Sequence, residues 1–421
     1  MASSYLTPGV YMEEVSSGPR PIESVGTSTA AFLGVAPDAR ARVQEAVAVN
    51  NWMQFTRTYA SVEQPVGTPL ARAVYGFFEN GGHRCFVVNV GADGSIAATV
   101  THGKRQGIAL LEEVDEVAIV AAPGFTDASS YDSLLSHCEK MQDRVAILDG
   151  PEDVPNLEAL LQVATERVTP RGPRPPAAAG SAESPPDPGT PKGGLRARAS
   201  TAGLGAYYVP YLTVRDPFDP KTLVNAPPSG AIAGIYARTD ATRGVHKAPA
   251  NELVRGALNV SFNVTRHEQG ELNQAGVNCI RFFPTDGIRV WGARTLAGSA
   301  SEWRYVNVRR LFNMVEESIA RATRWVVFEP NDFTLWKSIK RDISAYLNRL
   351  WRDGALMGKT AQEAFFVKCD EETNPPEVID AGQVVTLIGI APVKPAEFII
   401  FRIGQHQAGT SLDTEKEKAN G

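Results

Sequence analysis

The apolar positions in the first half of the chain follow two rhythms. Short apolar runs predict buried strands at residues 29–36, 85–90, 117–121 and 145–148, and ordered structure is predicted to resume at residues 206–212. Between these runs, apolar residues recur every three or four positions, which predicts amphipathic helices at residues 69–80 and 129–141. Strands that alternate with helices favour an α/β unit whose sheet is largely parallel.

In the last third the helical period is longer and more regular. Apolar residues at helical spacing predict one helix over residues 308–326. A second helix is predicted from Asp332, a suitable N-cap, to Gly354. Four strands are also predicted, a hairpin at 278–283 and 287–291 and two closing strands at 383–390 and 397–403. This part of the chain is therefore predicted to be an α+β unit.

Proline and glycine mark two segments that fit neither rhythm. Prolines and glycines are concentrated in residues 169–200, where Leu195 is the one large apolar residue. This insertion therefore buries too little apolar surface to offset the entropy lost when it becomes ordered. Near the N-terminus, prolines exclude a helix, and a short strand is predicted at Val10, Tyr11, Met12, Glu13, Glu14 and Val15. Because one strand cannot form a sheet alone, residues 1–20 are predicted to be an extended arm that docks on another sheet.

Composition narrows the class of protein. A length of 421 residues predicts two or three domains, and 43% hydrophobic with 21% charged residues is typical of a globular chain. The net charge of -5 argues against a general nucleic-acid binder. No apolar run is long enough for a membrane span, and the opening residues lack the pattern of a secretory signal. Four widely spaced cysteines are expected to be buried, reduced thiols of a protein made in the cytoplasm.

One glycine-rich segment superficially resembles a nucleotide-binding loop. Residues 354–360 contain two glycines followed by Lys359 and Thr360, but three residues separate the glycines where a phosphate-binding loop has four. A helix rather than a strand is predicted before the segment. We therefore interpret Gly354 as a helix stop and predict no nucleotide site.

Other candidate chemistry is equally weak. Residues 26–30 resemble the nucleophile loop of subtilisin-like proteases, but no histidine precedes Ser28, and a turn into a buried strand is favoured. Asp149, Glu152 and Asp153 could hold a divalent cation, although a solvated turn is favoured. The six histidines show no metal-ligand spacing; they are His83, His102, His137, His246, His267 and His406. The sequence therefore predicts no catalytic residue, cofactor or metal ligand.

Charge is distributed unevenly. Residues 111–160 contain twelve acids against two bases, and residues 301–352 contain ten bases against six acids. A homopolymer could stack one band against the other, and two solvated faces are the plainer interpretation.

Seven segments, most of them in the last third, have a specific pattern. They lie at residues 5–11, 287–295, 305–312, 316–319, 325–332, 350–356 and 389–398. Together they closely resemble contractile phage tail sheath proteins, most strongly from residue 278 to residue 404. The proline-rich insertion departs from the family pattern.

The resemblance implies a structural subunit of a phage tail, a tailocin or a phage-like contractile injection system. Family members form stacked rings, often hexameric, around an inner tube, between a baseplate and a terminal cap. One family domain has subtilisin-like topology without proteolysis. Assembly in the bacterial cytoplasm is expected, with no cofactor, nucleic acid or membrane insertion. We expect an inner core domain from residues 21–100 and 265–396, an outer α/β domain from 101–264, and a C-terminal arm from 397–421.

The two arms are the predicted contact sites between subunits. The C-terminal strand comprises Glu397, Phe398, Ile399, Ile400, Phe401, Arg402 and Ile403. Each arm is expected to add a strand to a neighbouring sheet. Hinges are predicted beside the strands, at Pro8, Gly18, Pro19, Pro392 and Pro395. The alternatives are a static tube or capsid-type protein and a hydrolase of subtilisin-like topology.

Overall fold

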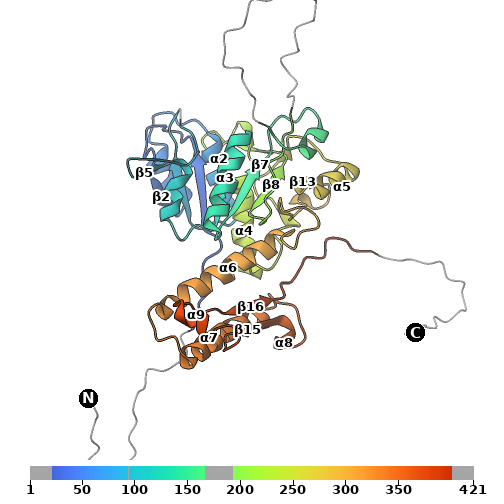
Figure 1. Ribbon diagram of the computed structural model, residues 1–421. Helices are drawn as coiled ribbons and strands as arrows, with labels where there is room; N and C mark the ends of the chain where they lie inside the picture. The colour runs from blue at the N-terminus through green and yellow to red at the C-terminus, as the bar shows by residue number, and fades with distance from the viewer. Residues whose placement is uncertain (1–20, 93, 166–192, 401–421) are drawn as a thin grey trace, which may run out of the picture.

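The computed structural model describes residues 21–92, 94–165 and 193–400. The predicted arm strand at residues 10–15, most of the proline-rich insertion, the hinge candidates Pro8, Gly18 and Pro19, and residues 401–403 lie outside the described residues. Figure 1 shows two units, a large α/β unit and a smaller C-terminal unit built on two long helices.

A nine-stranded mixed sheet forms the centre of the α/β unit, in the order β11-β14-β13-β8-β7-β6-β1-β3-β2. Its strands are β1 (Ala30–Gly34), β2 (Ala46–Val49), β3 (Cys85–Asn89), β6 (Ile119–Ala121), β7 (Val145–Asp149), β8 (Gly205–Val209), β11 (Glu252–Leu253), β13 (Val277–Phe283) and β14 (Gly287–Val290). The inner strands from β13 to β3 run parallel, and the outer pairings are antiparallel. The predicted strands and the largely parallel sheet are confirmed.

Helices cover the sheet and two small sheets flank it. The helices are α1 (Trp52–Tyr59), α2 (Pro69–Glu79), α3 (Ala128–Met141), α4 (Ser229–Arg243) and α5 (Arg266–Gln274), with short 3-10 helices η1 (Gly107–Glu113) and η2 (Leu157–Leu161). The small sheets are β10-β9-β12, from Leu223–Ala226, Leu212–Arg215 and Asn259–Val260, and β4-β5, from Thr99–Thr101 and Lys104–Gln106. The predicted helices α2 and α3 are confirmed.

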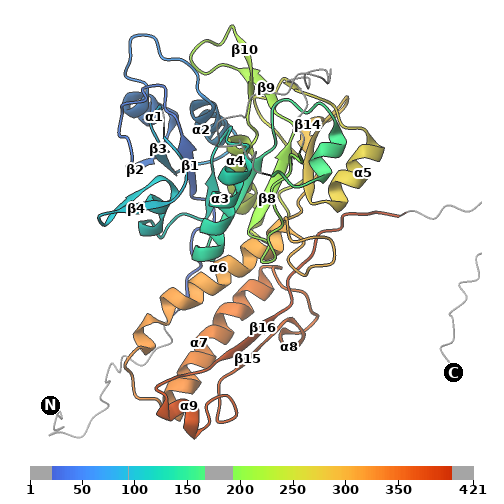
Figure 2. The same ribbon diagram turned by 45° about the horizontal axis from the view of Figure 1, so that its top comes forward.

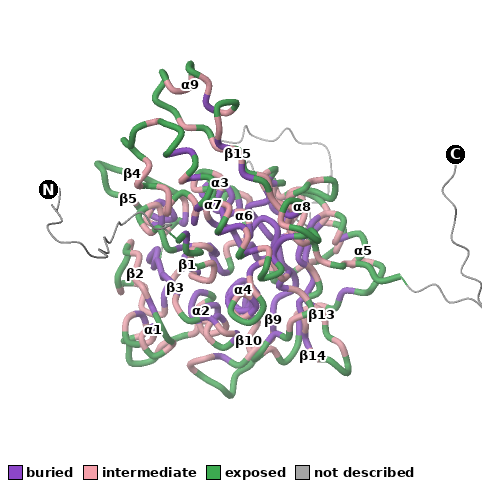
Figure 3. Tube along the Cα trace, turned by 90° about the horizontal axis from the view of Figure 1, so that it is seen from below, coloured by how far each residue is buried: buried purple, intermediate pink, exposed green. Residues whose placement is uncertain are grey.

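Helix α4 is the element that the apolar pattern does not predict. Almost all of its first eleven residues are buried, so it has no polar face and no visible helical period (Figure 3). Small residues let it cross α2 closely. A Cβ atom on Gly230 would lie 2.1 Å from the carbonyl oxygen of Ala73, and one on Gly234 would lie 2.4 Å from that of Phe77.

The C-terminal unit has its own core. It contains α6 (Val306–Ala322), η3 (Arg324–Val326), α7 (Phe333–Arg352), α8 (Ala361–Ala364), β15 (Phe365–Lys368), α9 (Pro376–Asp380) and β16 (Leu387–Ile390). Apolar side chains of α6 and α7 pack against each other and under β15. Asp332 caps α7 by accepting a hydrogen bond from the Leu335 N–H, and Gly354 follows that helix with a φ of +80°, as predicted.

The unit boundaries differ from the expected division of the chain. Strands from residues 21–100, 101–264 and 265–396 are hydrogen-bonded neighbours in the one nine-stranded sheet. For example, β1 pairs with both β3 and β6, and β13 pairs with β8. The hairpin β13–β14 therefore belongs to the α/β unit, because strand pairing joins segments that are distant in the sequence. The second core is built mainly from α6 onward, and Ile22 and Val245 also contribute to it.

A buried ion pair joins the two units. Arg310 of α6 donates to both carboxylate oxygens of Asp240 on α4, at 3.0 and 2.6 Å, and both side chains are almost fully buried. The same guanidinium lies 4.6 Å from the ring centre of Tyr236 and donates to the Thr27 carbonyl. The segment that precedes β1 is bound to the C-terminal unit as well, since Arg349 donates to the Ile22 carbonyl. The two units are therefore held as one body.

Candidate subunit interface

The C-terminal unit presents a sheet of only two strands. β15 and β16 pair antiparallel, with Phe366 opposite Gly389 and Lys368 opposite Leu387. These four residues share one face, because directly paired residues lie on the same side of a sheet. The alternate residues form the other face, on which Val367 is buried against the helices.

The outer face of this sheet is exposed and carries two large apolar side chains beside Lys368. Phe366 is 59% exposed and Leu387 is 51% exposed. Glycine at position 389 leaves room for the Phe366 ring, because a Cβ atom there would lie 2.1 Å from a ring carbon. Among the described residues, no further strand pairs with β15 or β16, so both outer edges keep unpaired backbone groups. Such edges are templates for an added strand.

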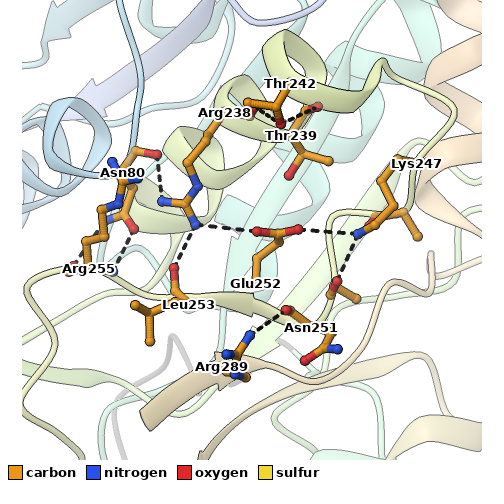
Figure 4. A network of polar contacts seen from close by, with 12 residues as sticks. Asn80, Arg238, Thr239, Thr242, Lys247, Asn251, Glu252, Leu253, Arg255 and Arg289 are labelled. Carbon is orange, nitrogen blue, oxygen red and sulfur yellow. Dashed lines mark hydrogen bonds and ion pairs between the residues drawn. The ribbon is translucent and has the colours of Figure 1, made fainter. Parts of the chain in front are cut away.

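In the nine-stranded sheet, by contrast, polar side chains cover the edge strand β11. Figure 4 shows the polar network around this two-residue strand. Arg238 donates to the carbonyls of Leu253 and Asn80, at 2.7 and 3.1 Å, and Arg289 donates to the carbonyl of Asn251. Lys247 forms an ion pair with Glu252 at 3.4 Å. A side-chain donor thus occupies the Leu253 carbonyl of the edge strand, and further polar contacts surround it.

The strand at the other edge of the large sheet, β2, is also covered by a side-chain hydrogen bond. The side-chain amide of Gln54 donates to the Ala48 carbonyl, and α1 packs beside the strand. The α/β unit therefore offers a poorer site for strand addition than the C-terminal unit.

The last described segment runs from the C-terminal unit to the α/β unit. Residues 391–393 are fastened beside residues 355–357, where Pro392 bridges to Leu356 and the Met357 N–H donates to the Ala391 carbonyl. Beyond Pro395, the Glu397 carboxylate is bound by Arg294 of the α/β unit. Phe398, Ile399 and Ile400 follow with 72%, 74% and 80% of their surface exposed, and this segment leaves the body of the molecule (Figures 1 and 2).

The predicted C-terminal strand and hinges are placed as follows. Residues 397–400 form no strand within their own chain, and the Glu397 side chain is turned toward its own subunit. Pro392 lies in the fastened segment, whereas Pro395 lies between the fastened segment and Glu397. The exposure of residues 398–400 is compatible with strand donation, which stays a prediction.

The weighed catalytic candidates form no catalytic arrangement. Ser28 lies in the turn that leads into buried β1, as favoured. Lys359 is exposed in the loop after α7. Within the described residues, no group of His, Cys, Asp and Glu side chains could hold a metal ion. None of the described helices is long and apolar enough to cross a membrane. All four cysteines are buried and free, as expected.

Asp149 corrects the expectation of a solvated turn. Its carboxylate is buried at the end of β7 and accepts hydrogen bonds from the backbone N–H and the hydroxyl of Ser229, both at 2.7 Å. Burial raises the pKa of Asp149 to about 7 despite these bonds. The residue thus caps α4, while Glu152 accepts a hydrogen bond from Asn225 and is not part of the same cluster. The sequence alone does not reveal this role, because Ser229 is 80 residues away.

One cavity in the α/β unit also contains charged groups. It has a volume of about 280 Å³ and lies between α2 and the β9–β10 hairpin. Arg72 and Asp216 on its wall neutralise each other in an ion pair of 3.1 Å. The cavity therefore combines no nucleophile with a base.

Two family models cover most of the chain. The phage tail sheath protein central domain matches residues 104–296, and the phage tail sheath C-terminal domain matches residues 299–406. The chain belongs to the phage tail sheath family. The boundary between the two matches coincides with the passage from the first core to the second. This family consists of structural sheath proteins and not of enzymes.

Solved sheath structures share the whole fold. The sheath of the extracellular contractile injection system PVC in its contracted state has a TM-score of 0.74 and 30% identity, covering 96% of this chain and 99% of that one. The helical sheath of the anti-feeding prophage in its contracted state has a TM-score of 0.70 and 30% identity, covering 96% of this chain and 100% of that one. The mixed multidomain α/β fold is therefore that of contractile sheath subunits.

Curated sheath relatives match over a shorter region. The tail sheath protein of Vibrio phage KVP40 is 33% identical over 192 residues, which are 45% of this chain and 27% of that protein. A prophage major tail sheath protein of Pseudomonas aeruginosa is 30% identical over 182 residues, which are 42% of this chain and 45% of that protein. The matched region thus spans less than half the length of these two curated relatives.

Proposed function

We propose that this protein is the structural subunit of a contractile sheath, which polymerises around an inner tube and contracts without nucleotide hydrolysis. The observation that carries the proposal is the β15–β16 sheet, which has two open edges and an exposed outer face with two large apolar side chains in a chain of the sheath family. An isolated two-stranded sheet is marginally stable, and added strands extend it.

The donors of these strands are the terminal segments of neighbouring copies. Residues 10–15 and the segment after Glu397 are rich in β-forming residues. Each main-chain hydrogen bond between copies contributes about 1 kcal/mol net. A few bonds per arm, repeated through a lattice, keep subunits linked while the backbone around Gly18, Pro19 and Pro395 changes direction.

The C-terminal unit is the part that faces the tube. The solvent face of α7 carries a set of exposed bases: Lys337, Lys340, Arg341, Arg349 and Arg352. The acid within α7, Asp342, is buried and forms an ion pair with Arg341 at 2.9 Å, which offsets one of these charges. A basic helical face of this kind favours a tube with an acidic surface, and the attraction weakens as salt screens it. The α/β unit, with its predicted subtilisin-like topology, then lies outward.

Contraction is a rearrangement of whole subunits. The Arg310–Asp240 pair and the two segments that cross between the units hold each subunit as one body, so the movement falls on the contacts between copies. The driving free energy is the difference in buried interface between the extended and contracted lattices. At about 25 cal/mol per Å², roughly 400 Å² of extra burial gives about 10 kcal/mol per subunit before entropic costs.

The proposed assembly is the one that the family resemblance implies. Copies form stacked rings of six around the tube, between a baseplate and a terminal cap, in a phage tail or tail-like particle that is assembled in the bacterial cytoplasm. The structures of the anti-feeding prophage include both a helical sheath and a baseplate, which supports this arrangement.

Electron microscopy of the purified protein tests this function. Hollow, helically ridged tubes that form without nucleotide are the expected result, and copies assembled on an inner tube are expected to show a second, longer lattice. Deleting residues 1–16 is expected to abolish tubes while the unfolding temperature of the subunit stays the same. A single lattice under all conditions would indicate a static polymer. Dispersed subunits, even with the tube protein present, would refute the proposal.

A further inference from the structure

The Glu397 carboxylate accepts four hydrogen bonds from three side chains. Arg294 donates to both of its oxygens, from Nε at 2.9 Å and from Nη2 at 2.8 Å. The side-chain amide of Asn273 on α5 donates at 2.6 Å, and the Tyr305 hydroxyl donates at 3.0 Å. Two parallel charge-assisted bonds fix the position as well as the charge of a carboxylate. These four contacts are here called the Glu397 clamp.

The partners of Glu397 are themselves fixed. Arg294 is almost fully buried, and its Nη1 donates to the carbonyl of Asn273 at 3.0 Å. Its backbone N–H donates to the side chain of Asn278, which lies on β13 of the large sheet. Tyr305 immediately precedes α6. Burial acts to raise the pKa of Glu397, but the hydrogen bonds from Arg294, Asn273 and Tyr305 outweigh it and lower the pKa, so the clamped carboxylate stays charged.

The clamp lies at a sharp change in exposure along the chain. Before it, residues 391–393 are fastened to the C-terminal unit, and after it three consecutive apolar residues are exposed. A fixed point next to a free apolar segment determines which residue is the first that can reach another molecule.

We propose that Glu397 is the anchor that fixes where the C-terminal segment leaves its subunit, so that Phe398, Ile399 and Ile400 enter a neighbouring copy in one register. This inference rests on the proposed sheath function and changes the predicted contact strand, since Glu397 belongs to its own subunit and pairing begins at Phe398. Register matters because a slip of one residue moves every side chain of a strand to the opposite face. Phe398 and Ile400 lie on one face of such a strand, and Ile399 lies on the other.

A nitroxide label on Ile400→Cys measures the anchor in free subunits. The four native cysteines are buried, so the label attaches to the new one. In the full-length protein, separated from tubes by size exclusion, Glu397→Gln is expected to raise the mobility of the label to that of an unanchored chain. Arg294→Lys, which keeps the charge but loses the paired donors, is expected to raise it less, and Tyr305→Phe least. The control is Glu302→Gln, a change at an exposed glutamate outside the clamp.

Assembly of the same variants, without the label, measures the register. Glu397→Gln is expected to reduce the fraction of subunits in ordered tubes at least roughly tenfold, equivalent to about 1.4 kcal/mol, and to leave the remaining tubes with irregular helical order. Glu302→Gln is expected to form normal tubes.

The outcomes separate the anchor from the sheath function. If the unaltered protein forms no tubes even with the tube protein present, the sheath function fails, and label mobility in free subunits still tests the anchor. If tubes form and Glu397→Gln changes neither mobility nor helical order, the anchor is refuted, even if the variant unfolds more easily, because that result describes a simple brace between the units. Should Glu397→Gln fail to fold, Arg294→Lys and Tyr305→Phe decide by the same two measurements.

Discussion

The nine-stranded sheet and the two-stranded sheet of this molecule differ most at their edges. The large sheet ends in β11, whose neighbouring carbonyls accept hydrogen bonds from Arg238 and Arg289, and in β2, where Gln54 binds a carbonyl. Within the described part of the chain, no side chain donates to a carbonyl of β15 or β16, and the exposed face of this small sheet carries Phe366 and Leu387. An unprotected edge is a liability for a monomer and a docking site for a polymer.

Because of this difference, the large sheet is expected to govern the stability of the subunit and the small sheet its assembly. The large sheet is buried under helices on a continuous core and determines whether the subunit folds. The small sheet packs one face on α7 and leaves the other open, so its outer residues contribute little to folding. Substitutions in the two sheets should therefore change different observables, as follows from the largest expected effect on stability to the smallest.

Asp240→Ala tests whether the two sheets belong to one body. The change leaves the almost fully buried Arg310 without its ionic partner, which is expected to cost about 3–5 kcal/mol. Urea unfolding followed by circular dichroism should show this loss, and the C-terminal unit should begin to unfold separately. The control is Glu116→Ala, which removes an exposed ion pair with Arg84 and should cost at most about 1 kcal/mol. Equal losses in the two variants would contradict the buried coupling.

Arg238→Ala opens the closed edge of the large sheet. The variant loses charged hydrogen bonds to the carbonyls of Leu253 and Asn80, with an expected cost of about 1.5–3 kcal/mol. Freed edge groups should also promote irregular aggregates, visible by light scattering. Arg243→Ala, at an exposed position near the end of the same helix, should change neither quantity. Aggregation that remains at the level of the unaltered protein would mean that the network does not protect this edge.

Phe366→Ser removes the aromatic ring from the open face. The free energy of unfolding should change by less than about 1 kcal/mol, because the ring is mostly exposed, while tube formation should be lost. Phe282 offers a matched control, since it is 51% exposed on β13 of the large sheet. Phe282→Ser should still form tubes. If both variants assemble equally well, as judged by electron microscopy, the open face is not the interface.

Acid should weaken the α/β unit through His137. Burial and the neighbouring Arg144 lower the pKa of His137 to about 4, from an ordinary value of 6.5. Between these values the unfolded chain binds a proton on His137 that the folded chain does not, so the contribution of His137 to stability falls as pH drops from 6.5 to 4. Asp149, whose pKa is raised to about 7, contributes in the opposite direction over this range. As pH drops through this range, the unfolding temperature of His137→Asn should therefore rise relative to that of the unaltered protein. His83→Asn, at an exposed position, should show no such relative change.

Prediction from sequence succeeded where the evidence is local. The helices α2, α3, α6 and α7 and most strands of the large sheet are confirmed, because each carries its own period or apolar run. It missed α4, which is buried on nearly all sides and so has no period, and β15, which is only four residues long. Of the candidate interface, the exposed apolar residues after Glu397 could be named, whereas the clamp and the open sheet could not.

The sequence by itself determined the local elements, the absence of any catalytic motif, and the membership of the sheath family. Only the tertiary structure decided which strands share a sheet, that Asp149 caps α4, and that Glu397 binds Arg294, Asn273 and Tyr305. The physical reason is distance along the chain. Helical periods and turn residues act over a few positions. Strand pairing, such as that of Ala30 with Ile119, and buried ion pairs, such as that of Arg294 with Glu397, join groups from tens of residues to more than a hundred residues apart, which no local pattern records.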